Sequence, residues 1–185
     1  MKVYLICGKS RHGKDTLANY MKKYYSDMGM KATILQISAP MKELIRNHFG
    51  WDGKEETKPR ELLQLLGTDI IRKKMGKDLY FISRTVEDAT ILGNFFDVII
   101  ISDGRFPIEI EYLKEHIPKA VIIHIERLGY ESELTDNQKK HLSETALDQY
   151  HDYDYEVVNT TLDLLEEEAK EIIRKEEVKD EKNDK

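Results

Sequence analysis

The segment Gly8–Thr16 constrains this chain more than any other stretch, because it contains two glycines separated by four residues and then a lysine. The short apolar run Val3–Ile6 precedes it, and apolar residues at helical spacing follow it from about Lys14. Glycines let successive backbone N–H groups converge on one point, and a helix N-terminus adds its positive end. The spacing therefore predicts a strand, a loop and a helix that hold the phosphate tail of a nucleoside triphosphate.

One position of this loop departs from the usual pattern. The Ser or Thr that commonly follows the lysine is replaced by Asp15, with Thr16 next. A carboxylate is a good ligand for Mg²⁺, although an acid stabilised by the helix dipole explains Asp15 equally well. Thr16 is predicted to bond the α-phosphate, and Lys14 the β- and γ-phosphates. The loop residues predicted to bind ATP are Gly8, Lys9, Ser10, Arg11, His12, Gly13, Lys14, Asp15 and Thr16.

Beyond the loop, short apolar runs alternate with helical patterns. Strands are expected at 33–37, 95–101, 120–125 and 155–158, in addition to the first one. Helices are expected at 41–45, 60–75, 78–92, 107–113 and from 162 onward, with a polar loop at 51–58. This alternation is typical of α/β proteins, and it predicts a three-layer fold in which a five-stranded parallel sheet carries helices on both faces.

Composition narrows the class of protein. The 185 residues suit one domain, and no apolar run approaches the length of a membrane span. A net charge of −6 argues against a broad nucleic-acid-binding surface, so any anion site must be focused. The single Cys7 excludes an intramolecular disulfide, and zinc-type Cys/His spacings are absent from the sequence. We expect a cytoplasmic protein with no nucleic-acid or membrane partner.

A second carboxylate is predicted near the loop. The apolar run that ends at Ser102 places Asp103 at the carboxyl end of a central strand, where ligands sit in open α/β sheets. Gly104 follows it instead of the second acid that ATP-hydrolysing motors commonly carry, which favours transfer to an acceptor over hydrolysis. Phosphoryl transfer depends on positioning and charge stabilisation, so converging arginines are expected. The candidates are Arg11, Arg60, Arg105 and Arg127.

Six short segments occur in a recognisable order along nearly the whole chain. They are 8–18 with its GKDT ending, 38–42 (SAPMK), 66–70 (LGTDI), 103–107 (DGRFP), 141–144 (HLSE) and 158–159 (VN). Together these segments resemble the bacteriophage and bacterial deoxynucleoside monophosphate kinases. Two departures from the family pattern are Ile108, where a polar residue is common, and the compressed region at 51–58. They leave the base preference open.

The resemblance implies a P-loop nucleoside monophosphate kinase fold, the use of ATP and Mg²⁺, and transfer of the γ-phosphoryl group to a deoxynucleoside 5′-monophosphate. It implies that Asn159 lies near the adenine and that Asp15 and Asp103 are the metal ligands. The implied catalytic residues are Lys14, Arg11, Asp103 and Arg127. The implied acceptor-binding residues are Lys42, Arg60, Gly67, Thr68, Phe81, Asp103, Arg105 and Glu109. For Phe81, a place in the core is an equally good interpretation.

The same resemblance divides the chain into functional parts. A single kinase domain is expected over 1–176, with acceptor-binding helices at about 39–92 and a lid at about 127–152 that includes Arg127 and the HLSE segment. A charged, disordered tail is expected over 177–185. The expected partner is a nucleoside monophosphate, and the protein is expected to be a monomer or homodimer. Two other functions stay open: a kinase for another phosphorylated acceptor, such as phosphomevalonate or dephospho-coenzyme A, and a nucleotide-binding switch.

Overall fold

The computed structural model describes residues 1–183, which form the five-stranded parallel sheet that the sequence predicts. The strand order is β2-β3-β1-β4-β5, so the strand before the phosphate loop lies in the centre. All neighbouring strands pair in parallel. The strands are β1 (Lys2–Cys7), β2 (Ala32–Gln36), β3 (Val98–Gly104), β4 (Val121–Arg127) and β5 (Tyr155–Asn159).

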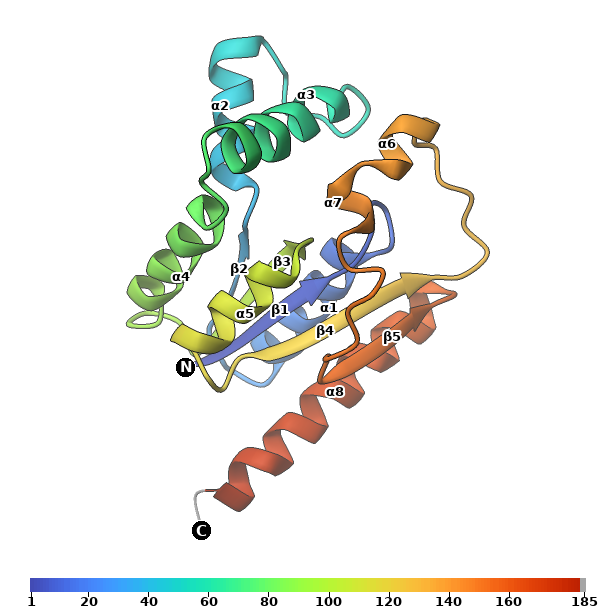
Figure 1. The fold of residues 1–185 in the computed structure, drawn as a ribbon. Coiled ribbons are helices and arrows are strands. Elements are labelled where there is room, and N and C mark those ends of the chain that lie inside the picture. The colour runs from blue at the N-terminus through green and yellow to red at the C-terminus, as the bar shows by residue number, and fades with distance from the viewer. Residues whose placement is uncertain (184–185) are drawn as a thin grey trace.

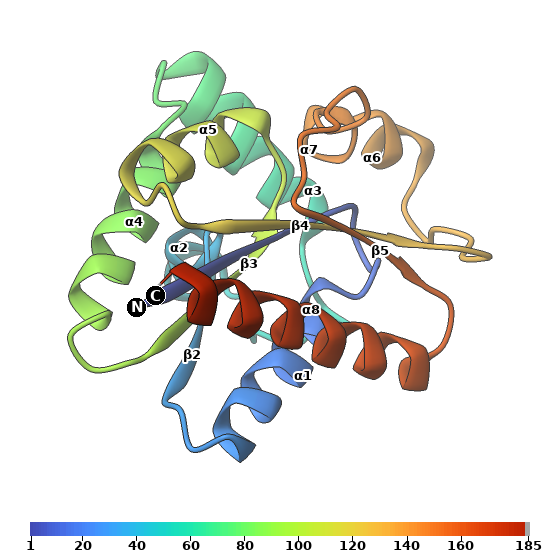
Figure 2. The same ribbon diagram turned by 90° about the horizontal axis from the view of Figure 1, so that it is seen from below.

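Helices cover both faces of the sheet, as Figure 2 shows. One face carries α1 (Lys14–Asp27) and α8 (Leu162–Asn183), and the other carries α4 (Tyr80–Leu92) and α5 (Pro107–His116). The remaining helices lie in the segments that we name, after the expectations above, the acceptor helices and the lid. They are α2 (Ala39–Phe49), α3 (Arg60–Gln64), η1 (Leu65–Lys74), α6 (Asp136–Lys140) and α7 (Leu142–Thr145). Within the described residues we find no helix that is both long and apolar enough to cross a membrane.

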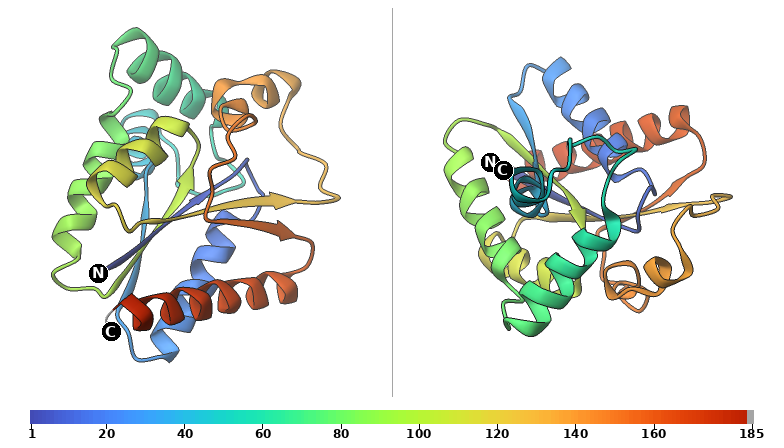
Figure 3. Two further views of the ribbon diagram at one scale, coloured as in Figure 1. Left: turned by 60° about the horizontal axis from the view of Figure 1, so that its bottom comes forward. Right: turned by 90° about the horizontal axis from the view of Figure 1, so that it is seen from above.

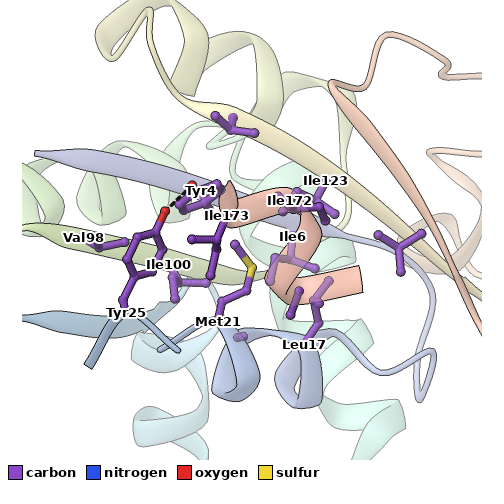
Figure 4. Close-up of a cluster of buried hydrophobic side chains, with 14 of the residues drawn as sticks. Tyr4, Ile6, Leu17, Met21, Tyr25, Val98, Ile100, Ile123, Ile172 and Ile173 are labelled. Carbon is purple, nitrogen blue, oxygen red and sulfur yellow. Dashed lines mark hydrogen bonds between the residues drawn. The ribbon is translucent and has the colours of Figure 1, made fainter. Parts of the chain in front are cut away.

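Two hydrophobic cores hold the layers together, because strand residues alternate between the two faces of the sheet. On the first face, Tyr4 and Ile6 of β1 pack against α1 and α8 (Figure 4). The hydroxyl groups of Tyr4 and Tyr25 share a hydrogen bond of 2.5 Å in this core, so both polar groups are satisfied despite burial. On the second face, Leu5 and Cys7 pack against α4 and α5.

The carboxyl ends of the parallel strands meet at one edge of the sheet. The phosphate loop follows β1, the acceptor helices follow β2, and the lid segment follows β4. Figure 1 shows α2, α3, α6 and α7 beyond this edge, and both views of Figure 3 show the acceptor helices and the lid on the same side of the sheet. The fold therefore brings every predicted site segment to one place.

The expected helix over 60–75 differs from the structure. Only Arg60–Gln64 is an α-helix, and Leu65–Lys74 forms the π-helix η1. Leu65 is exposed, and the buried positions of η1 are Gly67, Thr68 and Arg72. The wider π turn brings residues five apart onto one side, which aligns Gly67 with Arg72. This segment faces a polar cleft instead of the core, and that explains its buried polar residues.

The chain end also differs from the expectation. The sequence predicts a disordered tail over 177–185, yet α8 continues through Asn183, and the last two residues of the expected tail lie outside the described part. Lys2 explains part of the difference, because its ammonium group lies 2.7 Å from Glu177 and 2.8 Å from Asp180. Ion pairs four residues apart, such as Lys175 with Glu171, support the exposed face of the same helix.

Candidate active site

The phosphate loop is fixed by its backbone. Gly8 has a φ of 147° and Gly13 a φ of 103°, values that residues with a Cβ rarely adopt. A Cβ at Gly8 would lie 2.4 Å from the backbone oxygen of Ile125, and one at Gly13 would lie 2.5 Å from the amide nitrogen of Asn159. Arg11, with a φ of 61°, takes the left-handed conformation without being glycine. The loop therefore needs glycine at both ends for conformation and for space.

Lys14 lies at the centre of the loop and is almost fully buried. Its Nζ donates to the backbone oxygen of Lys9 at 2.6 Å, so the side chain folds back over the loop. Burial and then the nearby Arg105 guanidinium lower the pKa of Lys14, and Asp103 opposes them, so that the pKa is about 7. An anion bound at this point would favour the protonated form, as a phosphate-binding lysine requires.

Asp15 follows Lys14 at the first turn of α1. Its Oδ1 accepts hydrogen bonds from Ser102 at 2.8 Å and from Gln36 at 3.1 Å. Burial acts to raise the pKa of Asp15, but the Ser102 hydrogen bond and the Lys14 charge outweigh it and lower the pKa below its usual range. The carboxylate is therefore ionised, and together with the Ser102 hydroxyl it offers oxygens of the kind that Mg²⁺ prefers.

Asp103 has different partners from those that a metal ligand needs. Its Oδ1 accepts the N–H of Ile37 at 2.8 Å, and its Oδ2 accepts the N–H of Ser38 at 3.3 Å and the Ser38 hydroxyl. Lys42 lies 3.9 Å from the same carboxylate. With a φ of 73°, Asp103 also holds a strained backbone conformation for a residue that is not glycine. In this structure the carboxylate fixes the start of α2 to the end of β3.

A cleft of about 240 Å³ opens on the acceptor side of the loop, between α2, η1, the β3–α5 turn and the lid. All eight residues predicted to bind the acceptor line it, and Ser10, Arg11, Lys14 and Asp15 of the loop line its floor. The eight residues are Lys42, Arg60, Gly67, Thr68, Phe81, Asp103, Arg105 and Glu109. Side chains that are far apart in the sequence therefore meet in one cavity.

Most basic groups of this cleft are held by hydrogen bonds or ion pairs. Arg60 donates to the Ser10 hydroxyl at 2.9 Å and contacts Glu55 at 2.5 Å. Lys42 donates to Gln36 at 2.9 Å. These contacts hold long, flexible side chains in one orientation, which reduces the entropy lost when an anion binds.

Arg72 is a cleft residue that sequence analysis missed. Its guanidinium lies 2.6 Å from Glu109, 4.3 Å from the ring centre of Phe106 and 5.4 Å from that of Phe81. The second oxygen of Glu109 accepts the N–H of Arg105 at 2.7 Å. Phe81 is 2% exposed and belongs to the second core, although one side of it reaches the cleft. Arg72 is buried on η1, and no motif in the sequence singled it out as a cleft residue.

A second cleft opens on the opposite side of the loop. It is lined by Gly13 and Thr16 of the loop, by Arg127 at the end of β4, and by Asn159–Leu162 after β5. The Asn159 amide donates to the backbone oxygen of His12 at 3.0 Å, which fixes it against the loop. Arg127 and Asn159 therefore line the same cleft beside the loop.

Three loop residues, Arg11, Lys14 and Asp15, line both clefts. The other predicted loop residues divide: Ser10 lies on the acceptor side, and Thr16 lies on the opposite side. A third cavity, beneath the lid, is lined by Gly8, Lys9 and His12, which do not line either of the two clefts. A group bound on one side of Lys14 thus faces a group bound on the other.

The lid reaches across the acceptor cleft. Gln64 of α3 donates to the backbone oxygen of Gln138 of α6 at 3.2 Å. Arg11 is paired with Glu133, which lies between β4 and α6. No three or more His, Cys, Asp or Glu side chains in residues 1–183 gather as a metal site would require. A Mg²⁺ ion that accompanies a nucleotide takes many of its ligands from phosphates and water, so it needs no such cluster.

Comparisons with known proteins agree with this geometry. A family model described as deoxynucleotide monophosphate kinase matches residues 46–170, which is more than half of the chain. The match includes η1, the β3–α5 turn and the lid, and the phosphate loop lies before it. A comparison with curated proteins found no match.

Several solved structures with a similar fold are those of kinases, and they confirm the P-loop fold. An APS kinase from Mycobacterium tuberculosis, in complex with AMPPNP and APS, has a TM-score of 0.55 at 13% identity, over 94% of this chain and 95% of that one. Shikimate kinase from Aquifex aeolicus has a TM-score of 0.51 at 15% identity, over 97% and 98%. A gluconokinase from Sinorhizobium meliloti has a TM-score of 0.50 at 13% identity, over 91% and 89%.

Proposed function

The chain belongs to the deoxynucleotide monophosphate kinase family, and on that premise we propose how its two clefts divide the reaction. ATP binds in the cleft lined by Thr16 and Asn159, and a deoxynucleoside 5′-monophosphate binds in the cleft lined by Arg60 and Arg105. The γ-phosphoryl group passes between them, which yields ADP and the nucleoside diphosphate.

The observation that carries this proposal is the position of Lys14. It lines both clefts, and so do Arg11 and Asp15, so donor and acceptor phosphates would meet over one group of loop residues. A hydrolase would need only the donor side. A cleft of about 240 Å³ with basic side chains around its rim, facing the same lysine, supports a second phosphorylated substrate.

The donor cleft supplies contacts along a triphosphate. The N–H groups of the loop and of the first turn of α1 would bind the β-phosphate, and Thr16 would bind the α-phosphate. Asn159 and the residues after it would lie beside the adenine. Arg127, whose guanidinium packs 4.8 Å from the ring centre of Tyr130, would reach the phosphates from the lid side.

Transfer needs no covalent enzyme intermediate and no general base. A monophosphate oxygen, already ionised near neutral pH, attacks the γ-phosphorus in line, and the bond from the γ-phosphorus to the β–γ bridging oxygen breaks to release ADP. Lys14 and Arg11 would stabilise the charge on the transferred group, and Arg60 and Arg105 would orient the acceptor phosphate. The lid over the acceptor cleft would exclude water.

Mg²⁺ fits beside Asp15. That carboxylate is ionised and lies next to the Ser102 hydroxyl, which suits a hard cation whose other ligands are phosphate oxygens and water. Asp103 fits a direct metal contact less well, because both of its oxygens already accept hydrogen bonds from the start of α2. When bound, the ion would neutralise charge on the ATP phosphates.

An ADP-release assay tests the proposed function. Purified protein is incubated with ATP, magnesium and each common deoxy- or ribonucleoside monophosphate in turn, with phosphomevalonate and dephospho-coenzyme A as further acceptors. We expect ADP release to depend on a deoxynucleoside monophosphate, and conversion of that acceptor to its diphosphate. Release that is equal without any acceptor, or that needs one of the other two acceptors, would contradict the proposal.

Lys14→Ala links this activity to the loop. Loss of the ammonium group should lower kcat/KM at least about 100-fold, because it removes charge stabilisation from both clefts. Lys22→Ala is the matched control, since Lys22 lies on the exposed side of the same helix. A Lys14→Ala variant that keeps most of the transfer rate would refute the assignment.

A further inference from the structure

Glu144, on the short lid helix α7, bridges the two substrate-binding parts of the site. It is a carboxylate with only 8% of its surface exposed. Its Oε2 accepts the backbone N–H of Ser10 in the phosphate loop at 2.9 Å. Its Oε1 accepts a hydrogen bond from Arg105 Nη1 at 2.8 Å. Each oxygen therefore serves a different part of the site, and one side chain joins the lid to both.

This carboxylate holds Arg105 by its side chain, and the turn after β3 holds it by its backbone. Arg105 also approaches the backbone oxygen of Ser143 at 3.4 Å, so the lid supplies two acceptors to one guanidinium nitrogen. The backbone N–H of Arg105 donates to the Glu109 carboxylate. An arginine has five N–H donors in a fixed fork, so these contacts leave donors for a phosphate. Glu144 therefore orients the guanidinium without using all its donors.

The lid segment that carries Glu144 lies close to η1 at its other end, although the His141 nitrogen that faces η1 makes no hydrogen bond within residues 1–183. Nδ1 of His141 accepts the N–H of Ser143 at 3.2 Å, which caps α7. Nε2 of the same ring lies 3.5 Å from Asp69 Oδ2 on η1. The segment His141–Glu144 thus runs from η1 to the phosphate loop, and its position fixes where the Glu144 carboxylate lies.

We propose that Glu144 is a positioning residue that couples lid closure to Arg105. The proposal rests on the proposed function, in which Arg105 orients the acceptor phosphate. With the lid in place, Glu144 fixes the Arg105 guanidinium relative to the Ser10 amide, so the acceptor-side arginine is aligned with the phosphate loop in one step. When the lid moves away, Arg105 loses its side-chain partner and its orientation.

Glu144→Gln tests this coupling with almost no change of shape. Glutamine has one carbonyl oxygen, so it cannot accept from both Ser10 and Arg105, and its amide group would face a donor. We expect kcat for transfer to fall at least tenfold, while KM for ATP changes less than twofold, because the donor cleft keeps its contacts. Glu144→Asp keeps the charge but shortens the side chain, so its kcat should lie between those of the Gln variant and the wild type.

Asp148→Asn is the matched control. Asp148 follows α7 and its carboxylate pairs with Lys9 at 2.7 Å, but both side chains are substantially exposed. Removing this charge from the same stretch of chain should leave kcat within twofold. If Asp148→Asn lowers kcat as much as Glu144→Gln does, general electrostatics of the lid explains the effect and the coupling proposal is wrong.

A double-mutant cycle with Arg105→Gln separates positioning from a purely structural role. If Glu144 acts through Arg105, Glu144→Gln should lower kcat less than threefold in the Arg105→Gln background. An equal loss in both backgrounds, or a kcat of Glu144→Gln within twofold of wild type, would overturn the proposal. Transfer by the wild type is measured first: its absence refutes the proposed function, whereas wild-type transfer with an unaffected Glu144→Gln variant refutes only this coupling.

Discussion

The two sides of Lys14 are built by different means. The phosphate loop depends on main-chain geometry, in which Gly8 and Gly13 allow a backbone path that a Cβ would block. The acceptor cleft depends on side-chain pairs such as Arg72 with Glu109 and Arg105 with Glu144. Substitutions that add a Cβ should therefore disrupt the phosphate loop, and substitutions that remove a charge should disrupt the acceptor cleft. The predictions below use that difference.

The largest effect is expected for the buried pair on the acceptor side. Arg72→Met leaves the Glu109 carboxylate without its ionic partner in a place where neither side chain is more than 7% exposed. Such a loss costs about 3–5 kcal/mol of unfolding free energy. Lys73→Met, the next residue along η1, removes an exposed pair with Asp69 and should cost less than about 1 kcal/mol. Urea unfolding of both variants checks this, and equal losses would contradict the distinction.

A methyl group added at Gly8 should disrupt the phosphate loop. Gly8→Ala places a Cβ 2.4 Å from the backbone oxygen of Ile125, which cannot move aside without shifting β4. The loop must then shift by up to about 1 Å, and this displacement should lower kcat/KM about 100-fold. Gly29→Ala has the same kind of positive φ but open space around it, so it should cost about 1 kcal/mol of stability and leave kcat/KM unchanged. Wild-type kinetics in Gly8→Ala would show that the loop tolerates the collision.

Removal of an acceptor-side charge should affect one substrate only. Arg60→Gln keeps a polar side chain but loses the charge that is held between Ser10 and Glu55. A charge-assisted hydrogen bond contributes about 1.5–3 kcal/mol, so KM for the monophosphate should rise at least about tenfold. KM for ATP should change much less. Arg84→Gln on the exposed side of α4 is the control. Equal increases in both KM values would refute the division into two sides.

The pH dependence of ATP binding should show the smallest effect. Because the pKa of Lys14 is lowered to about 7, the free protein loses this proton as the pH rises, and phosphate binding must restore it. The Kd of a non-hydrolysable ATP analogue should therefore rise about eightfold between pH 6.5 and pH 8. Lys14→Arg should remove this slope, since a guanidinium stays protonated. An identical slope in both proteins would assign the titration to another group.

Sequence analysis predicted the loop side more completely than the acceptor side, for a physical reason. The loop is local: its glycines, Lys14 and the helix after it are contiguous, so their spacing determines their geometry. The number of strands and their parallel pairing also followed from apolar runs and connecting helices, whereas their order in the sheet was not predicted. The acceptor side joins residues that are distant in sequence, and the partners of Arg72 in the cleft lie on α4 and α5 as well as on the turn between β3 and α5.

The two carboxylates near the loop show the same limit. Asp103 follows an apolar strand, and that position correctly placed it at the ligand-binding edge of the sheet. Its hydrogen bonds to Ile37 and Ser38 depend on how β2 ends beside β3, which no local pattern encodes. Glu144 lay within a segment that resembles the family, yet its contact with Ser10 spans 134 positions. Partners of this kind become visible only in the folded chain.

The most direct test of the account is whether both substrates bind at once. Calorimetric titration of a deoxynucleoside monophosphate that supports ADP release, into protein saturated with a non-hydrolysable ATP analogue and magnesium, would measure this. The two-sided loop predicts one bound monophosphate per chain, with an affinity at least as high as without the analogue. Loss of monophosphate binding in the presence of the analogue would mean that the two compete for one cleft, which contradicts the account.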